Sequence, residues 1–221
     1  MTATEQKSLT TTEAAVVSRV SVRNVNRVID EKILPESLFE VGPEGARRLT
    51  ADACVFISFY FEAANRLTAE ERLRIIATAC RQLRGVEVSA MEREWIVRQE
   101  FLTVDLAPFL RDVRQRLEKL SAARAMVVED PEILSGTPVI RGTRVPVYYV
   151  AASVGAGEPM ERILEDYPSL TAEEVELAAL YAEAIPSRGR PRPSAPLPAG
   201  AVIVAHYRVP SRHAATRKLA S

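Results

Sequence analysis

Three stretches of the chain carry residue types that could do chemistry. Residues 135–146 read Ser-Gly-Thr-Pro-Val-Ile-Arg-Gly-Thr-Arg-Val-Pro, with two glycines, two prolines and two arginines. Carboxylates crowd residues 161–176, and histidine occurs only at His206 and His213. These residue types suggest three kinds of site: a phosphate-binding loop, a metal-dependent nuclease centre, and a nucleophile with its base.

The run at 135–146 lacks the marks of a phosphate loop or a catalytic loop. A phosphate loop needs glycine-rich backbone that leads directly into a helix N-terminus, often with a lysine followed by Ser or Thr, and this run has neither that spacing nor the lysine. A nucleophile needs a base within reach, but both histidines lie in the C-terminal tail. Prolines fix φ and glycines permit tight turns, so we expect a compact β-arm. We expect Arg141 and Arg144 to tie this arm to the acidic helices that follow it.

A metal-dependent nuclease is the enzyme alternative. It would need Glu161, Glu165 and Asp166 to converge, but charge runs of this kind are usually solvated helix faces. Thr171 and Glu174 have the spacing of a helix-capping box, which explains them without chemistry. No Cys and His spacing resembles a metal site. We therefore expect no enzyme activity, no metal and no cofactor.

The charge distribution separates a body from a tail. The formal net charge is zero, yet residues 186–221 hold seven Arg and Lys and no acidic residue, which leaves 22 basic and 29 acidic residues before them. The start of this tail mixes proline and glycine with arginine and cannot pack a core. We expect the tail to stay disordered until it binds an anionic partner.

Targeting signals are not visible in the sequence. No apolar run approaches the roughly 20 residues of a membrane helix, and the N-terminus has no basic segment that leads into an apolar one. Cys54 and Cys80 lie in apolar helical patterns, which suits reduced core thiols. We expect a cytoplasmic protein with no membrane partner.

The fold is expected to be mainly α-helical with small β elements. Strands are expected within 86–105 and at 125–130. The helix at 50–64 is apolar on several faces, which favours a buried helix, with a dimer interface as the alternative. An inward stripe is expected on the next helix at Leu73, Ile76, Cys80 and Leu83. Capping residues and apolar spacing predict helices over 50–64, 68–83, 106–120, 147–154, 159–166 and 172–185.

The N-terminal segment predicts two short helices. Thr10 and Glu13 have capping-box spacing for the first helix, and Ser21 can cap the second. Pro35 ends the unit. Two short helices joined by a tight turn describe a helix-turn-helix. The second helix would bury one apolar stripe, made of Val25, Val28 and Ile29.

The stretch TTEAAVVSRVSVRNVNRVIDEKILP resembles the helix-turn-helix of excisionases and other regulators related to the MerR family. In that family a small wing with paired basic residues follows the second helix, and EVGPEGARRLT occupies that place, with Gly42, Pro43 and Gly45 available for its turn. The resemblance implies DNA binding, with base contacts in the major groove and phosphate contacts from the wing. The implied DNA-binding residues are Arg23, Asn24, Asn26, Arg27, Arg47 and Arg48.

One residue departs from this pattern. Related sequences often place glycine in the turn between the helices, and this chain has Arg19. Because a left-handed residue other than glycine costs roughly 1 kcal/mol, we expect the turn to differ in detail. Residues 9–48 hold six acidic and six basic residues, so the alternative is the solvated face of a small helical domain.

A second resemblance is carried by GTPVIRGTRVPV and ILEDYPSLTAEEVELAALYA, within 128–185. These strings are similar to the small domain of unknown function 433, whose hallmark is GxPVIxGTRxPV followed by YPxLT. The resemblance implies a three-helix scaffold of helix-turn-helix type, related to VapB-type antitoxins whose neighbours are PIN-like ribonuclease toxins. The hallmark residues we assign to this scaffold are Gly136, Pro138, Gly142, Thr143, Arg144, Tyr167 and Pro168.

The two resemblances together imply an antitoxin of a type II toxin-antitoxin system that also represses its own operon by binding operator DNA. The toxin would be a PIN-like ribonuclease encoded by the adjacent gene, whose carboxylates hold Mg²⁺ or Mn²⁺. Tail arginines would pair with those carboxylates. The helix at 172–185 has more apolar surface than one core contact needs, which favours a partner chain. The expected toxin-binding residues are Leu177, Leu180, Tyr181, Arg188, Arg190 and Arg192.

The rival hypothesis is a stand-alone transcription regulator without a toxin, in which the tail adds phosphate contacts. In the antitoxin hypothesis the chain forms a homodimer and a hetero-oligomer with the toxin. The expected domains are a helix-turn-helix with wing at 8–49, a connecting region at 50–124, a GTR-motif domain at 125–185 and the tail at 186–221.

Overall fold

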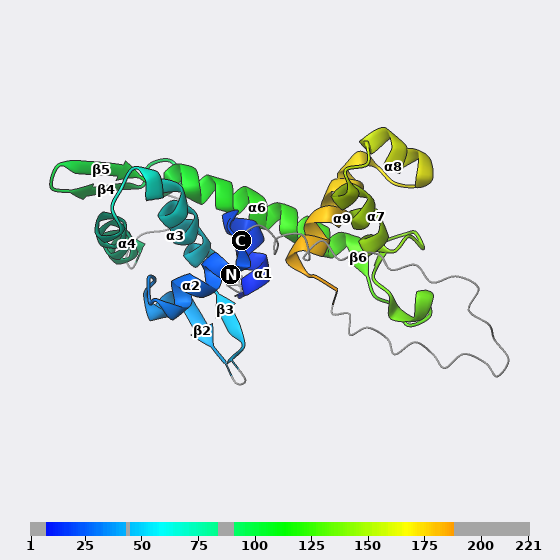
Figure 1. Ribbon diagram of the computed structural model, residues 1–221, viewed down its shortest axis with the longest axis horizontal. Helices are drawn as coiled ribbons and strands as arrows, with labels where there is room; N and C mark the ends of the chain where they lie inside the picture. Colours follow the sequence, from blue (N-terminus) through cyan, green and yellow to red (C-terminus); the bar gives the residue numbers. More distant parts are fainter. Residues whose placement is uncertain (1–7, 43–44, 84–90, 188–221) are drawn as a thin grey trace, which may run out of the picture. The chain divides into compact units, whose positions relative to one another are not determined.

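The computed structural model describes residues 8–42, 45–83 and 91–187. Within these ranges the protein is mainly helical with small antiparallel sheets, which confirms the expected fold class (Figure 1). Pro43 of the expected wing turn and nearly all of the tail lie outside the described residues, so the expectations about them stay predictions. In the described ranges no helix combines the length and apolar character that a membrane crossing requires.

The N-terminal part pairs two helices with a three-stranded sheet. The strands are antiparallel in the order β1-β3-β2, and Glu40 of β2 lies opposite Arg48 of β3. The elements are β1 (Leu9–Thr10), α1 (Thr11–Ser18), α2 (Val22–Asp30), the 3-10 turn η1 (Glu36–Leu38), β2 (Phe39–Val41) and β3 (Arg47–Leu49).

Side-chain caps fix the starts of α1 and α2, as the sequence predicts. Thr10 Oγ1 accepts a hydrogen bond from the Glu13 N–H at 3.3 Å, and Glu13 Oε2 accepts one from the Thr10 N–H at 2.9 Å. Ser21 Oγ accepts from the Asn24 N–H at 3.2 Å. These bonds satisfy N–H groups that have no partner inside the helix. The predicted stripe of Val25, Val28 and Ile29 is buried beneath α2.

Arg19 adopts the left-handed conformation that glycine usually takes after a helix. Its φ of 54° and ψ of 41° end α1, and the following Val20 N–H donates to the Ala15 carbonyl oxygen at 3.0 Å. This is the pattern of a helix that closes on a left-handed residue. The chain therefore forms the tight turn despite the expected cost of roughly 1 kcal/mol for a side chain in this conformation.

The middle of the chain is built around the buried helix α3. α3 shares the first hydrophobic core with α1 and α6, and the Phe59 and Phe109 rings meet edge to face with their centroids 5.6 Å apart. The favoured interpretation of residues 50–64 as a buried helix is confirmed. The elements here are α3 (Ala51–Glu62), η3 (Ala63–Asn65), α4 (Ala69–Leu83), β4 (Ile96–Gln99), β5 (Leu102–Asp105) and α6 (Ala107–Met126).

Two expectations for this region need correction. The buried face of α4 centres on Ile75, Ile76 and Ala79, and Leu73 is exposed because the buried stripe runs over the neighbouring positions. α6 extends to Met126, so the strand expected at 125–130 shrinks to two residues.

The two cysteines lie in different surroundings. Cys54 is wholly buried, and burial raises the pKa of its thiol to about 12. Cys54 is therefore a core thiol, as expected, and its raised pKa makes it unreactive because the thiolate is the reactive form. Cys80 is only half-buried.

A second hydrophobic core follows α6. Its members include Ile140, Val150 and Ile163, from three successive elements of the region. Strands β6 and β7 pair antiparallel, with Val127 opposite Ile140. The elements are β6 (Val127–Val128), η4 (Leu134–Gly136), β7 (Val139–Ile140), α7 (Val147–Ala156), α8 (Met160–Asp166) and α9 (Ala172–Ala184).

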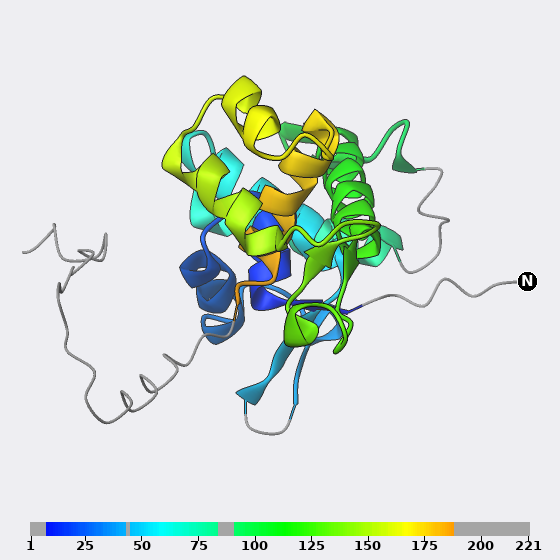
Figure 2. The ribbon, with the colours of Figure 1, turned by 90° about the vertical axis from the view of Figure 1, so that its right-hand side faces the viewer.

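The apolar surface of α9 is covered by other helices of the same chain. It packs against α7 in the second core and also against α6 and α1 (Figure 2). Its buried residues are Val175, Ala178, Tyr181 and Ala184. The surplus apolar surface seen in the sequence is therefore accounted for by neighbouring helices and gives no support to a partner chain.

Candidate nucleic-acid interface

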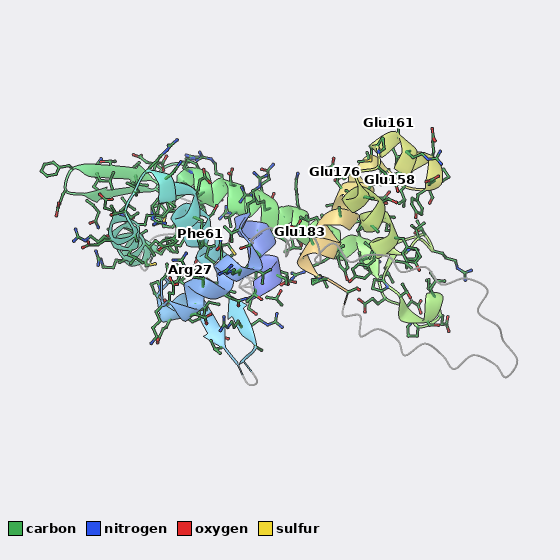
Figure 3. The ribbon with its side chains drawn as sticks, in the orientation of Figure 1. Arg27, Phe61, Glu158, Glu161, Glu176 and Glu183 are labelled. Atoms are coloured by element: carbon green, nitrogen blue, oxygen red, sulfur yellow. The ribbon has the colours of Figure 1, made fainter. Side chains whose placement is uncertain are left out.

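The outer face of α2 forms a polar surface. Its residues line an open hollow of about 860 Å³, and the apolar stripe beneath them is buried in the first core. The amphipathic helix thus fixes which side chains point outward. Figure 3 labels Arg27 on this face. The lining residues are Ser21, Arg23, Asn24, Asn26, Arg27, Asp30 and Glu31.

Arg23 and Asn24 sit near the start of α2. Arg23 is exposed and forms no ion pair among the described residues, while Asn24 is half-buried and its backbone N–H is used by the Ser21 cap. Exposed Arg and Asn side chains can hydrogen-bond guanine and adenine edges in the major groove. Both residues line the open hollow over α2.

Arg27 is partly occupied by its own helix. Its Nε donates to Glu31 Oε1 at 2.9 Å, one turn further along α2. The hydrogen bond and the negative charge of Glu31 raise the pKa of Arg27. An exposed pair of this kind contributes little to stability, so a phosphate or a base could compete for the guanidinium.

Arg47 joins the β2–β3 hairpin to α2. Its Nη1 donates to Asn26 Oδ1 at 2.9 Å, and its Nη2 donates to Asp30 Oδ1 at 2.6 Å. Arg47 is therefore engaged within the chain, and so is the Asn26 side chain. Because successive residues of a strand point to opposite faces, Arg48 points away from these contacts. Arg48 is exposed and forms no ion pair in the part of the chain that the structure describes.

Two exposed apolar residues next to this surface were missed at the sequence level. Val22, the first residue of α2, is 39% exposed, and Val41 at the end of β2 is 57% exposed. Val22 precedes Val25 by three positions, a spacing that would place it on the buried stripe. Only the path of the preceding turn shows that it faces outward.

The glycine of the GTR motif makes a tight turn. Gly142 has φ +77°, and the Thr143 N–H donates to the Ile140 carbonyl at 3.0 Å. Glycine at the third position of such a turn is what a type II turn requires. Thr143 Oγ1 donates to the same carbonyl at 2.8 Å and accepts from the Val145 N–H at 3.0 Å. These contacts are structural.

Arg141 holds the arm to the preceding helix. Its Nε and Nη2 donate to the Ala125 carbonyl oxygen at 3.0 and 2.9 Å, and its backbone N–H donates to the Met126 carbonyl at 2.8 Å. Both carbonyls belong to the last turn of α6, where carbonyl groups have no partner within the helix itself. The expected tie to the later acidic helices is therefore wrong for Arg141. Arg144 is exposed and forms no ion pair within the described ranges.

The remaining hallmark residues shape the connections to α7 and α9. Gly136 has φ +79°, and the Pro138 carbonyl accepts from the Val147 N–H at 3.0 Å at the start of α7. Tyr167 and Pro168 lie in a turn closed by the Leu170 N–H, which donates to the Tyr167 carbonyl at 3.0 Å. The structure thus gives these positions architectural contacts.

The expected toxin-binding set is not one exposed surface. Tyr181 is only 6% exposed, so it is a core residue. Leu177 and Leu180 are half-buried and pack against the second core. The expectation fails for Tyr181 because α9 is covered by other helices of its own chain. The other members of the set, Arg188, Arg190 and Arg192, lie outside the described residues.

Two of the three acidic residues of α8, Glu165 and Asp166, have an arginine partner. Arg162 Nη1 lies 3.1 Å from Glu165 Oε2, and its Nη2 lies 3.8 Å from Asp166 Oδ1. In the described ranges no group of three or more His, Cys, Asp or Glu side chains is arranged to hold a metal ion.

Comparisons with known proteins identify relatives. Residues 127–182 match the family described as protein of unknown function (DUF433), which confirms the DUF433 part of the second resemblance. The protein described as "Uncharacterized protein y4eO", from Sinorhizobium fredii (strain NBRC 101917 / NGR234), is 56% identical over 208 residues, which are 92% of this chain and 93% of that protein.

A solved structure, the crystal structure of Rv2018 from Mycobacterium tuberculosis, is 20% identical, with a TM-score of 0.33 over 77% of this chain and 95% of that one. At that score and identity the similarity says nothing about fold or function here. The identity to y4eO and its coverage are decisive: this chain belongs to the same family as the y4eO protein, and its residues 127–182 match the DUF433 domain family.

Proposed function

We propose that this protein binds DNA through α1, α2 and the β2–β3 hairpin, which would together form a winged helix-turn-helix. The observation that carries this proposal is the outer face of α2, where Arg23 lies beside Asn24 without an ion-pair partner among the described residues, and where Arg47 holds a hairpin against the same helix. The tight turn at Arg19 supports it.

In this proposal the start of α2 enters the major groove. Arg23 would donate to guanine and Asn24 would pair with adenine, while Val22 would contact a thymine methyl group. Arg48 would hold a backbone phosphate. Arg47 would mainly position the hairpin, because its hydrogen bonds to Asn26 and Asp30 keep it engaged.

We further propose that the protein is an antitoxin that neutralises a PIN-like ribonuclease and represses its own operon. The match of residues 127–182 to the DUF433 family supports this idea together with the basic, acid-free tail at 186–221. Tail arginines would pair with the carboxylates that hold metal in the toxin. In this proposal the chain forms a homodimer and joins the toxin in a hetero-oligomer.

Co-purification tests the antitoxin proposal. The full chain and a truncation after Ser187 are each expressed with the adjacent open reading frame, and only one partner carries a tag. The truncation keeps the Ile185 carbonyl, which accepts a hydrogen bond from the Tyr148 hydroxyl at 2.8 Å. A ribonuclease that co-purifies with the full chain and becomes active with the truncated chain supports the proposal.

A stand-alone regulator is the second candidate function. The burial of Tyr181 favours it, because α9 packs on its own chain and one argument for a toxin partner is lost. Here the tail would add phosphate contacts, so truncation should only weaken DNA binding and reduce its salt dependence. If nothing co-purifies while the full chain shifts its upstream DNA, this candidate replaces the antitoxin.

A further inference from the structure

A second hollow lies between the end of α1, α6 and α9, with a volume of about 490 Å³. Its polar lining is mostly cationic, with Arg19, Arg116 and Lys119 beside one carboxylate, that of Glu183. Figure 3 shows Glu183 on α9 at the side where this helix meets α1. The rest of the lining is apolar, made of Ala15, Val16, Val20 and Leu180.

Among the described residues, contacts within the chain account for the position of Arg116 but not for those of Arg19 and Lys119. Arg116 Nη1 donates to the Val17 carbonyl at 3.0 Å, and its Nη2 donates to Asp112 Oδ2 at 3.3 Å. Its side chain is 15% exposed and caps the last turn of α1. Arg19 and Lys119 are exposed, and neither forms an ion pair among the described residues. A fold without a ligand gives no reason to bring them beside Arg116.

Arg19 and Arg116 repel each other in this hollow. Burial lowers the pKa of Arg116, and the nearby positive charge of Arg19 lowers it further, against the opposing effect of Asp112 and Glu62. The apolar part of the lining reduces the local dielectric and strengthens such interactions. An anion between the cations would turn this repulsion into attraction.

We propose that this hollow binds a phosphate group, with Arg19 and Lys119 as its ligands and Arg116 as a fixed positive charge behind them. A phosphate group carries up to two negative charges and several acceptor oxygens, which suits converging guanidinium and ammonium groups. A small phosphorylated molecule and a DNA backbone phosphate offer the same chemistry. The DNA source rests on the proposed function, whereas the small-molecule source does not.

The site would couple two parts of the chain. Arg19 belongs to the turn that leads into α2, and α6 leads directly into the region that matches DUF433. Bound phosphate would therefore hold the proposed DNA-binding helix and the DUF433 region to each other through α6. This gives the site a role distinct from the base contacts proposed for Arg23 and Asn24.

Titration of the full-length protein with pyrophosphate tests the site. Thermal midpoints are measured at constant ionic strength, with sodium chloride as the reference salt. The test variant combines Arg19→Asn with Lys119→Gln, because Asn tolerates the left-handed conformation. Arg98→Gln is the matched control, since Arg98 is exposed on β4 and forms no ion pair among the described residues. Without pyrophosphate the double variant should melt no lower than the wild type, because it removes repulsion.

A parallel titration with a short DNA duplex separates the two sources of phosphate. If the source is a small molecule, pyrophosphate binds the wild type and the control, and the double variant binds it at least about tenfold more weakly. If the source is DNA, pyrophosphate has little effect, and the double variant loses roughly 2 from the slope of log affinity against log salt. If the double variant behaves like the wild type in both assays, the proposed site is refuted. Pyrophosphate binding without DNA binding keeps the site and refutes the proposed function.

Discussion

The Glu13 carboxylate serves two contacts at once. Oε2 accepts the Thr10 N–H within the capping box of α1, and Oε1 forms an ion pair with Arg124 of α6. The Glu13 side chain is only 6% exposed, so its charge depends on these partners. Glu13→Gln keeps a side chain that can complete a capping box and removes the charge that faces Arg124.

The size of the effect follows from the burial of both partners. A hydrogen bond between charged groups contributes about 1.5–3 kcal/mol, and removing one partner of a fully buried pair costs about 3–5 kcal/mol. Arg124 is 24% exposed, so water can solvate its stranded guanidinium. We therefore expect a loss of about 2 kcal/mol, which corresponds to about 4–8 °C in the thermal midpoint of a chain of this size.

Glu174→Gln is the matched control. Glu174 completes the equivalent capping box of α9, where its Oε2 accepts the Thr171 N–H at 2.8 Å, and it has no arginine partner in the described ranges. The free energy of unfolding of Glu174→Gln should differ from that of the wild type by no more than about 0.5 kcal/mol. Urea and thermal denaturation measure the loss of stability in each variant. The excess loss in Glu13→Gln over Glu174→Gln reports the interaction with Arg124.

The difference in stability between the wild type and Glu13→Gln should depend on pH in a defined direction. Burial opposes ionisation of Glu13, but hydrogen bonds from Arg124 and Thr10 and the charge of Arg124 outweigh it, so the pKa lies below the ordinary value of 4.5. A folded pKa below the unfolded one contributes stability above that value and loses it as pH falls. The gap between the wild type and Glu13→Gln should be full at pH 7 and shrink below about pH 4.5. Equal costs for the two variants at pH 7, or a gap that acid leaves unchanged, would refute the reasoning.

Three further predictions follow from particular contacts. Gly157→Ala and Gly142→Ala should each destabilise the protein by about 1 kcal/mol, because both glycines have φ near +80°. Gly155→Ala within α7 should be neutral or stabilising by up to about 1 kcal/mol. Thermal midpoints that shift in the same direction for all three variants would contradict this prediction. Arg141→Met should cost about 1 kcal/mol in urea denaturation by freeing the Ala125 carbonyl in the last turn of α6, and an unchanged midpoint would contradict the capping role. Cys54 should react with a thiol reagent only on unfolding, since burial raises the pKa of its thiol to about 12, and fast labelling of the native protein at this residue would refute that account.

Local signals were readable from the sequence because their partners lie a few residues away. The capping boxes at Thr10 and Thr171 form as expected, since a Ser or Thr three residues before Glu brings both groups into reach. The turn at Gly142 was expected for a similar reason, because only glycine adopts its backbone conformation without strain.

Contacts between distant residues could not be read in the same way. Arg47 pairs with α2 across 21 and 17 residues, and sequence reasoning assigned it to phosphate instead. Arg141 reaches back to α6 rather than forward to the acidic helices. A charged side chain near the surface has many possible partners, and its sequence neighbours do not select among them.

The faces of α9 show the same limit for apolar residues. The sequence indicated apolar positions on more than one face, but periodicity cannot say whether a partner chain or the same chain covers them. In the structure α1 and α6 cover what α7 leaves exposed, and Tyr181 becomes a core residue. The hollow around Arg19 was invisible for a related reason, because its cations come from elements far apart in the chain.

The most direct test of the central claim is the preference of this protein for its own upstream DNA. Fluorescence anisotropy at fixed salt gives the affinity for that duplex and for a scrambled duplex of equal length. The wild type and Arg98→Gln should prefer the upstream duplex, and Arg23→Gln should lose about 1–3 kcal/mol of that preference. Equal affinity for both duplexes, or a preference that Arg23→Gln leaves intact, would contradict the claim that α2 reads DNA.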